Sequence, residues 1–276
     1  MKDSNKGSSK IKKILLVILS IIIIAIVGFV IYEIATINKT YYIGEKNLQI
    51  PIFVYHDLVE DESEIEFDYM QTTVKTFEKQ MTQLMKLGYK PITYQDLVEY
   101  KDGNKPISKR SFIVTFDDGY IGVYDYAYKI AQKYNIPITS FEISEKVGSD
   151  GYYTWEQAKE MKESGLVSIY LHGYKHTNYN ERPTQELLTE TNMAYEDLQK
   201  GLEDENVLKV FTYPCGLCTE EQRKVLFENG YIQNLTDNKI NTSNKLDLSG
   251  LHRSYPLSDS TFKILLKIQY RTIRYK

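Results

Sequence analysis

The sequence predicts an α/β fold in which a parallel sheet is closed, or nearly closed, into a barrel, preceded by one membrane-spanning helix. Three observations predict it. Apolar, strand-like segments alternate with helical patterns from residue 112 to residue 269, as expected when parallel strands are joined by helices. Residues 14–32 carry no charge, and about 20 apolar residues are needed for a helix to cross a bilayer. The hydrophobic fraction of 42% is ample for a folded core.

The N-terminal region is expected to be a signal anchor. Residues 1–13 hold five lysines and one aspartate, which gives them a net charge of +4. Because the whole chain has a net charge of −3, the residues after 13 have a net charge of −7. Lysines flanking an apolar helix stay in the cytoplasm, which predicts a cytoplasmic tail at 1–13, a transmembrane helix at 14–37 and an extracellular domain on a single-pass cell-membrane protein. A cleaved signal peptide is the alternative, although its apolar core is normally shorter. A domain this acidic is a poor partner for nucleic acid.

A linker is expected at 38–47, and one domain at 48–276. The first strand is predicted at 48–55, followed by an acidic loop at 60–68. Apolar residues at helical spacing predict a helix from 74 to 87, and a second short helix follows at 94–100. Further strands are expected near 112–116, 136–143, 166–171, 208–213, 231–235 and 250–255, and helices near 122–134, 154–164, 184–202, 219–229 and 259–269.

Two adjacent carboxylates end the buried strand at 112–116. Asp117 and Asp118 are followed by Gly119, at the carboxyl end of a central strand where α/β folds collect their chemistry. Adjacent carboxylates repel, and a metal ion bound by one of them would relieve the repulsion. An Asp-Asp-Gly turn without chemistry is the alternative.

A histidine pair follows the strand predicted at 166–171. His172 and His176 are four residues apart, so on one helical turn or in a tight loop they face the same way. Two imidazoles and one carboxylate form a common catalytic zinc site that leaves one position open.

These motifs resemble those of the polysaccharide deacetylases, the family-4 carbohydrate esterases. The resemblance rests on Thr115-Phe-Asp-Asp-Gly-Tyr120 with the histidine pair, and Pro51-Ile-Phe-Val-Tyr-His-Asp57 is similar to the permuted branch that includes poly-N-acetylglucosamine deacetylases. It covers roughly residues 49–256 and implies a deformed, incomplete (β/α) barrel. It also implies a polysaccharide substrate, peptidoglycan or an exported poly-N-acetylglucosamine, from which N-acetyl groups are hydrolysed.

The resemblance implies a role for each site residue. Asp118, His172 and His176 would hold one divalent metal ion, zinc by its ligand type. Asp117 would be the general base, and His56 the general acid that protonates the departing amine. For His56 the alternative is a hydrogen-bonded structural histidine at a strand end.

Three further residues are expected on the substrate side of the site: Tyr213, Cys215 and Arg253. A backbone N–H in the turn from Tyr213 to Gly216 would stabilise the oxyanion. Relatives commonly carry an aromatic residue where this chain has Cys215, and an arginine where it has Thr212. Arg253 is expected either to orient the catalytic carboxylate in place of that arginine or to be a surface residue.

Several alternatives stay open. Gly173 replaces the family's usual Ser or Thr, and His252 is expected to be structural. Cys215 and Cys218 form a C-x-x-C that is read as a loop disulfide, as two free thiols or, least favoured, as a redox motif. The same site would suit an O-acetyl esterase acting on a xylan-type substrate, and a non-catalytic carbohydrate-binding protein is a further reading.

Overall fold

The computed structural model describes residues 4–67 and 69–274, so residues 1–3 of the predicted tail and Asp68 of the predicted acidic loop lie outside the described residues. The chain divides into two units, Met1–Lys39 and Thr40–Lys276. The first is built on helix α1 (Ser4–Thr36). Within it, Lys12–Thr36 contains an 18-residue window with a mean hydropathy of 3.5 and is, in the described part of the chain, the one helix long and apolar enough to cross a membrane.

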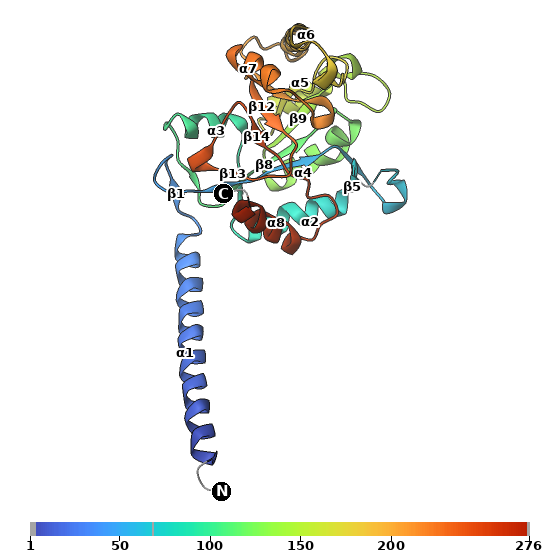
Figure 1. Ribbon diagram of the computed structural model, residues 1–276. Coiled ribbons are helices and arrows are strands. Elements are labelled where there is room, and N and C mark those ends of the chain that lie inside the picture. Colours follow the sequence, from blue (N-terminus) through green and yellow to red (C-terminus); the bar gives the residue numbers. More distant parts are fainter. Residues whose placement is uncertain (1–3, 68, 275–276) are drawn as a thin grey trace. The chain divides into compact units, whose positions relative to one another are not determined.

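The second unit is a nearly closed parallel barrel of seven strands, which confirms the predicted fold (Figure 1). An isolated bridge between Phe53 and Ser254 joins its two ends, with hydrogen bonds of 2.9–3.0 Å on both sides of the bridge. All six residues of β8 are buried, as expected for a central strand covered on both faces. In spatial order the strands are β14 (Leu251–His252), β12 (Ile232–Leu235), β11 (Val210–Thr212), β10 (Val167–Leu171), β9 (Ile138–Glu142), β8 (Ser111–Phe116) and β3 (Ile52–Tyr55).

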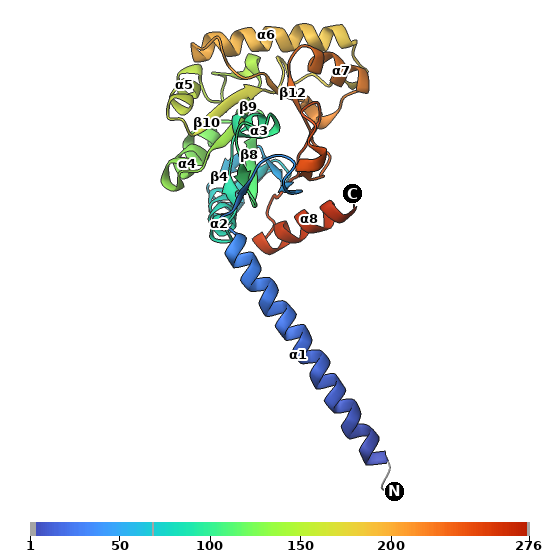
Figure 2. The same cartoon turned by 90° about the vertical axis from the view of Figure 1, so that its left-hand side faces the viewer.

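Helices lie outside the sheet (Figures 1 and 2). The helix predicted at 122–134 begins as a π-helical turn, Val123–Ala127, before it continues as α4. The other helices agree with the predicted ranges to within a few residues, except that the last one runs on to Arg274. Their bounds are α2 (Val74–Lys86), α3 (Tyr94–Lys101), α4 (Tyr128–Tyr134), α5 (Trp155–Glu163), α6 (Thr184–Leu202), α7 (Glu220–Glu228) and α8 (Thr261–Arg274).

The first and last predicted strands differ from the prediction. Pro51 divides the first one: β2 (Gln49–Ile50) pairs with β13 (Asn241–Thr242), and only β3 joins the barrel. The reason is that proline has no N–H to donate to a central ladder. The last predicted strand shortens to β14, with Ser254 making the closing bridge alone.

Short strands complete the second unit. The segment predicted as a linker contains β1 (Thr40–Tyr41), which pairs with β7 (Ile107–Ser108), so part of it is ordered on the domain. The strands β4 (Asp57–Val59) and β5 (Gln71–Thr73) pair with each other, and β6 (Lys90–Pro91) pairs with the start of β8.

Candidate active site and metal centre

The candidate residues follow neighbouring strands of one parallel barrel. His56 comes directly after β3, Asp117 and Asp118 after β8, and His172 after β10. Strands β3 and β8 are paired, and β9 lies between β8 and β10. The carboxyl ends of parallel strands meet at one edge, so the fold gathers these side chains at one mouth of the barrel.

Asp118, His172 and His176 converge on one point. The Nε2 atoms of the two histidines lie 3.2 and 3.4 Å from Oδ1 of Asp118, and one ligand atom from each residue falls within 4.8 Å of the others. The histidine pair lies on the loop after β10. Asp118 and His176 both have positive φ, 73° and 56°, a conformation uncommon for residues other than glycine that is often found at functional sites.

The hydrogen bonding of His172 fits a cation at this point. Its Nδ1 lies 3.0 Å from the carbonyl oxygen of Thr212, and a carbonyl can only accept, so Nδ1 carries the hydrogen. In the neutral ring Nε2 is then an acceptor aimed at Asp118, itself an acceptor. Among the described residues no group donates a hydrogen bond to Oδ1 of Asp118, although that atom is buried. Two facing acceptors require a cation or a proton between them, and two imidazole nitrogens with one carboxylate oxygen suit zinc.

The pKa values of Asp118 and His172 shift in opposite directions. Burial acts to raise the pKa of Asp118, but the neighbouring His172 outweighs burial and brings that pKa to about 2. Burial acts to lower the pKa of His172, and the two carboxylates reverse that effect and raise the pKa above its ordinary value. Both shifts favour a negative carboxylate beside a positive charge.

Asp117 faces a different partner, Arg253. The two guanidinium nitrogens donate to the two carboxylate oxygens at 2.7 and 2.8 Å, a bidentate pair with both side chains buried. Arg253 also donates to the hydroxyls of Thr212 and Thr236. Burial acts to raise the pKa of Asp117, but Arg253 holds it below the ordinary value, so Asp117 stays ionised at neutral pH.

Arg253 is completely buried, which decides between its two predicted positions. It is not a surface arginine, and although it was expected on the substrate side of the site, a side chain with no exposed area does not contact a polymer directly. The hydroxyl of Thr212, the position at which the family resemblance predicts an arginine, accepts a hydrogen bond from Arg253.

Replacing Arg253 is expected to cost stability. In Arg253→Met, Asp117 becomes a buried charge without its partner, and breaking such a pair costs about 3–5 kcal/mol. Arg182→Met is the matched control, because Arg182 is 54% exposed and its ion pair is with Glu186, four residues later in sequence, a contact worth about 0.5 kcal/mol. Urea denaturation of both variants measures the difference; equal losses would contradict the role of the ion pair.

His56 is buried beside this pair. The Nδ1 atom of His56 has no hydrogen-bond partner among the described residues. The alternative role of His56, a structural histidine held by hydrogen bonds, therefore has no support at this atom. The ring lies parallel to that of Tyr255, with centroids 5.9 Å apart and an interplanar angle of 6°. Burial lowers the pKa of His56, and Asp117 and Asp118 oppose that effect.

The turn after β11 corrects another expectation. The side chain of Tyr213 is buried, and its hydroxyl donates to Gln233 at 2.5 Å, so it cannot bind substrate through its ring. Cys215 is exposed, with φ +60°. The N–H of Gly216 donates back to the carbonyl of Tyr213, and Pro214 has none, which makes the Cys215 N–H the turn's candidate oxyanion donor.

The surroundings of His252 and of the two cysteines bear on the roles predicted for them. His252 pairs with Asp237 at 2.9 Å, in agreement with a structural role. Both cysteines are free thiols, and burial raises the pKa of Cys218 to about 11. A thiol with so high a pKa is a poor nucleophile, so Cys218 is not the reactive thiol of a redox motif.

Two residues near the site were not predicted. Tyr255 stacks on His56, and Thr236 accepts from Arg253. Tyr255 could have been found, because residues two apart on an extended segment share a face and Arg253 was already singled out. Thr236 carries no comparable sequence signal.

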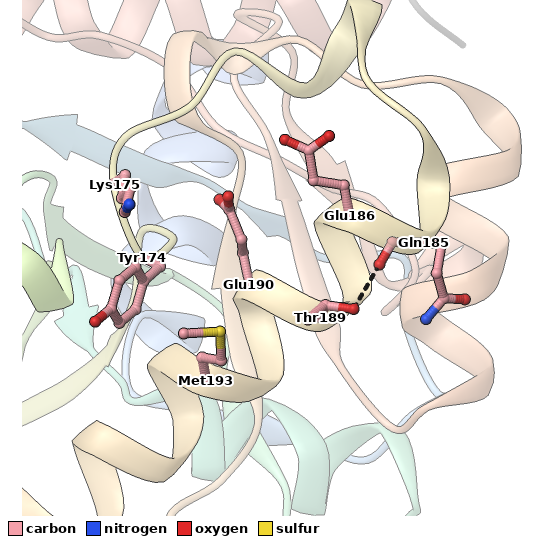
Figure 3. A pocket seen from close by; sticks show the side chains of 7 residues that line it. All are labelled: Tyr174, Lys175, Gln185, Glu186, Thr189, Glu190 and Met193. Carbon is pink, nitrogen blue, oxygen red and sulfur yellow. Dashed lines mark hydrogen bonds between the residues drawn. The ribbon is translucent and has the colours of Figure 1, made fainter.

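A groove of about 420 Å³ lies beside the histidine loop (Figure 3). Tyr174 and Lys175, between the two histidines in sequence, line one side of it. On α6, Glu190 accepts hydrogen bonds from Tyr179 and Thr177, which ties the loop to the helix. The residues that line the α6 side are Gln185, Glu186, Thr189, Glu190 and Met193.

Comparisons with known proteins agree with this geometry. Residues 104–233 match the family model described as polysaccharide deacetylase. The putative polysaccharide deacetylase YxkH of Bacillus subtilis is 30% identical over 211 residues, which cover 76% of this chain and 72% of that protein. The poly-beta-1,6-N-acetyl-D-glucosamine N-deacetylase of Staphylococcus epidermidis is 28% identical, and the match covers 57% of this chain and 58% of that protein.

Solved structures share the barrel fold. The Streptococcus pyogenes deacetylase PplD, in complex with acetate, superposes with a TM-score of 0.72 at 24% identity, over 81% of this chain and 99% of that one. IcaB from Ammonifex degensii superposes with a TM-score of 0.69 at 24% identity, over 80% and 97%.

Proposed function

This chain belongs to the polysaccharide deacetylase family, and we propose on that premise that it hydrolyses N-acetyl groups on an extracellular N-acetylglucosamine-containing polysaccharide and releases acetate. Family membership makes it a hydrolytic deacetylase. Staphylococcal relatives are named for poly-β-1,6-N-acetylglucosamine, which supports that polymer as a candidate substrate. Peptidoglycan is the second candidate.

Asp118, His172 and His176 would hold the divalent ion, and the donor set favours zinc. When bound, the ion supplies Lewis acidity toward a water molecule and toward the acetyl carbonyl. The observation that carries the proposal is that two adjacent carboxylates have different kinds of partner. Asp118 faces two imidazole nitrogens, while Asp117 faces a buried guanidinium.

The chain's own groups would carry the proton transfers. Asp117, held ionised and in a fixed orientation by Arg253, accepts the proton of the attacking water. His56, buried directly after β3, would donate a proton to the departing amine nitrogen when its ring is in the imidazolium form. The N–H of Cys215 would donate to the developing oxyanion. The groove beside Tyr174 would hold a neighbouring sugar unit of the polymer.

Acetate release by the full chain in detergent tests this function. Suitable substrates are chitin oligomers, poly-β-1,6-N-acetylglucosamine, peptidoglycan and acetylxylan. Release from an N-acetylated polymer supports the proposal. Release from acetylxylan alone identifies an O-acetyl esterase, and polymer binding without any acetate identifies a non-catalytic binding protein.

We also propose that α1 is an uncleaved single-pass anchor with the domain outside the cell. The support is its apolar stretch and the lysines that precede it. Protease added to intact cells is expected to digest the domain. A domain protected until lysis contradicts this topology, and a shortened chain released from the membrane indicates a cleaved signal sequence.

A further inference from the structure

Helix α8 carries two apolar faces. On one of them Ile264 and Ile268 are almost fully buried, at 2% and 1% exposure. The other face holds Phe262, Leu266 and Tyr270, four residues apart, with exposures of 70%, 52% and 59%. Both views place α8 at the periphery of the second unit (Figures 1 and 2). A contiguous stripe of large exposed apolar side chains marks an interaction surface.

The sequence around this stripe is basic. Lys263 and Lys267 lie on the helix, with Asp259 paired to both just before it. Arg271, Arg274 and Lys276 follow, and residues 260–276 include no aspartate or glutamate. The chain after residue 13 is acidic as a whole, so this concentration of cations is local. An apolar stripe beside lysines and arginines is the pattern of helices that lie in the interface of an anionic bilayer.

The covalent connection to α1 keeps the second unit close to any bilayer that α1 crosses. Helix α1 ends at Thr36 and the second unit begins at Thr40, four residue steps that reach about 14 Å at most. Within the second unit, α8 lies against the N-terminal part of the domain, where Gln269 donates to Gln49 of β2 at 3.1 Å.

We propose that the stripe of Phe262, Leu266 and Tyr270 docks into the headgroup region of a bilayer that contains anionic lipid. This contact would be a second membrane attachment besides α1, and it would limit the orientations of the domain above the surface. The proposal does not depend on the deacetylase activity.

A tryptophan scan of the full chain tests it. Leu266→Trp is compared with Phe227→Trp, which replaces an α7 side chain of similar exposure, 47%. Both variants are reconstituted in nanodiscs with and without anionic lipid, using brominated acyl chains as the quencher. The native Trp155 is common to both, and circular dichroism checks that both variants are folded.

The expected result is a blue-shifted emission for Leu266→Trp that bromolipid quenches several-fold more than that of Phe227→Trp. The quenching is expected to weaken in neutral discs and at high salt, because screening removes the attraction of the lysines. Equal quenching of the two variants would overturn the proposal. A blue shift that persists in detergent and depends on protein concentration would also overturn it, because a second copy of the chain would then cover the stripe.

Discussion

His176→Ala is expected to lose the bound metal ion and more than about 100-fold of its turnover, with the fold retained. Even residues that only support metal ligands typically cost 10–100-fold when replaced, and His176 supplies one of three candidate ligand atoms. Its side chain is 38% exposed on a loop, so its removal opens no core cavity. Elemental analysis of the desalted protein measures the metal, and acetate release measures the turnover.

His252→Ala is the matched control for this variant. It removes the histidine that pairs with Asp237 and is not one of the three clustered candidate ligands, and its metal content is expected to stay unchanged. His176→Asn is a second variant, since asparagine tolerates the positive φ of this position better than alanine does. Unchanged metal content in both His176 variants would show that the ligand set is wrong.

Asp117→Asn is expected to keep the metal and to lose turnover. The amide keeps the shape of the carboxylate but cannot accept a proton, and general-base catalysis is worth ~10²–10⁴-fold. The loss is therefore expected in kcat, with a smaller change in KM. Some stability is also lost, because Arg253 then faces an uncharged partner in a buried site.

Asp118→Asn separates the two aspartates. It removes a candidate ligand at a positive-φ position that asparagine tolerates, so metal binding weakens and excess zinc partly restores activity. Zinc titration of both variants beside the parent protein makes the comparison. Rescue of Asp117→Asn but not of Asp118→Asn would exchange the two assignments.

The helices could be predicted because their signals are local. Helix α6 runs from Thr184 to Leu202, as expected from its pattern, and Gly165 and Gly230 have the positive φ of helix stops. The split of the first strand was not predicted, because β2 pairs with β13 about 190 residues later. Nothing within residues 48–55 specifies that partner.

The site was predictable where spacing carries the chemistry, as in Asp117-Asp118 and the histidine pair. It was not predictable where burial decides. Arg253 is an ordinary arginine in sequence, and only the closed barrel buries it between Asp117, Thr212 and Thr236. Tyr213 has the sequence position of a substrate contact, yet its ring turns into the core toward Gln233.

The bridge between Phe53 and Ser254 brings the first and last strands of the barrel together, with His56 on one side of the seam and Arg253 on the other. A ribosome delivers residue 56 and all three candidate ligands long before residue 253. A nascent or prematurely terminated chain would thus possess every ligand, with an open barrel and no guanidinium for Asp117. Closure of the barrel between Phe53 and Ser254 is therefore the folding step that brings Arg253 to Asp117.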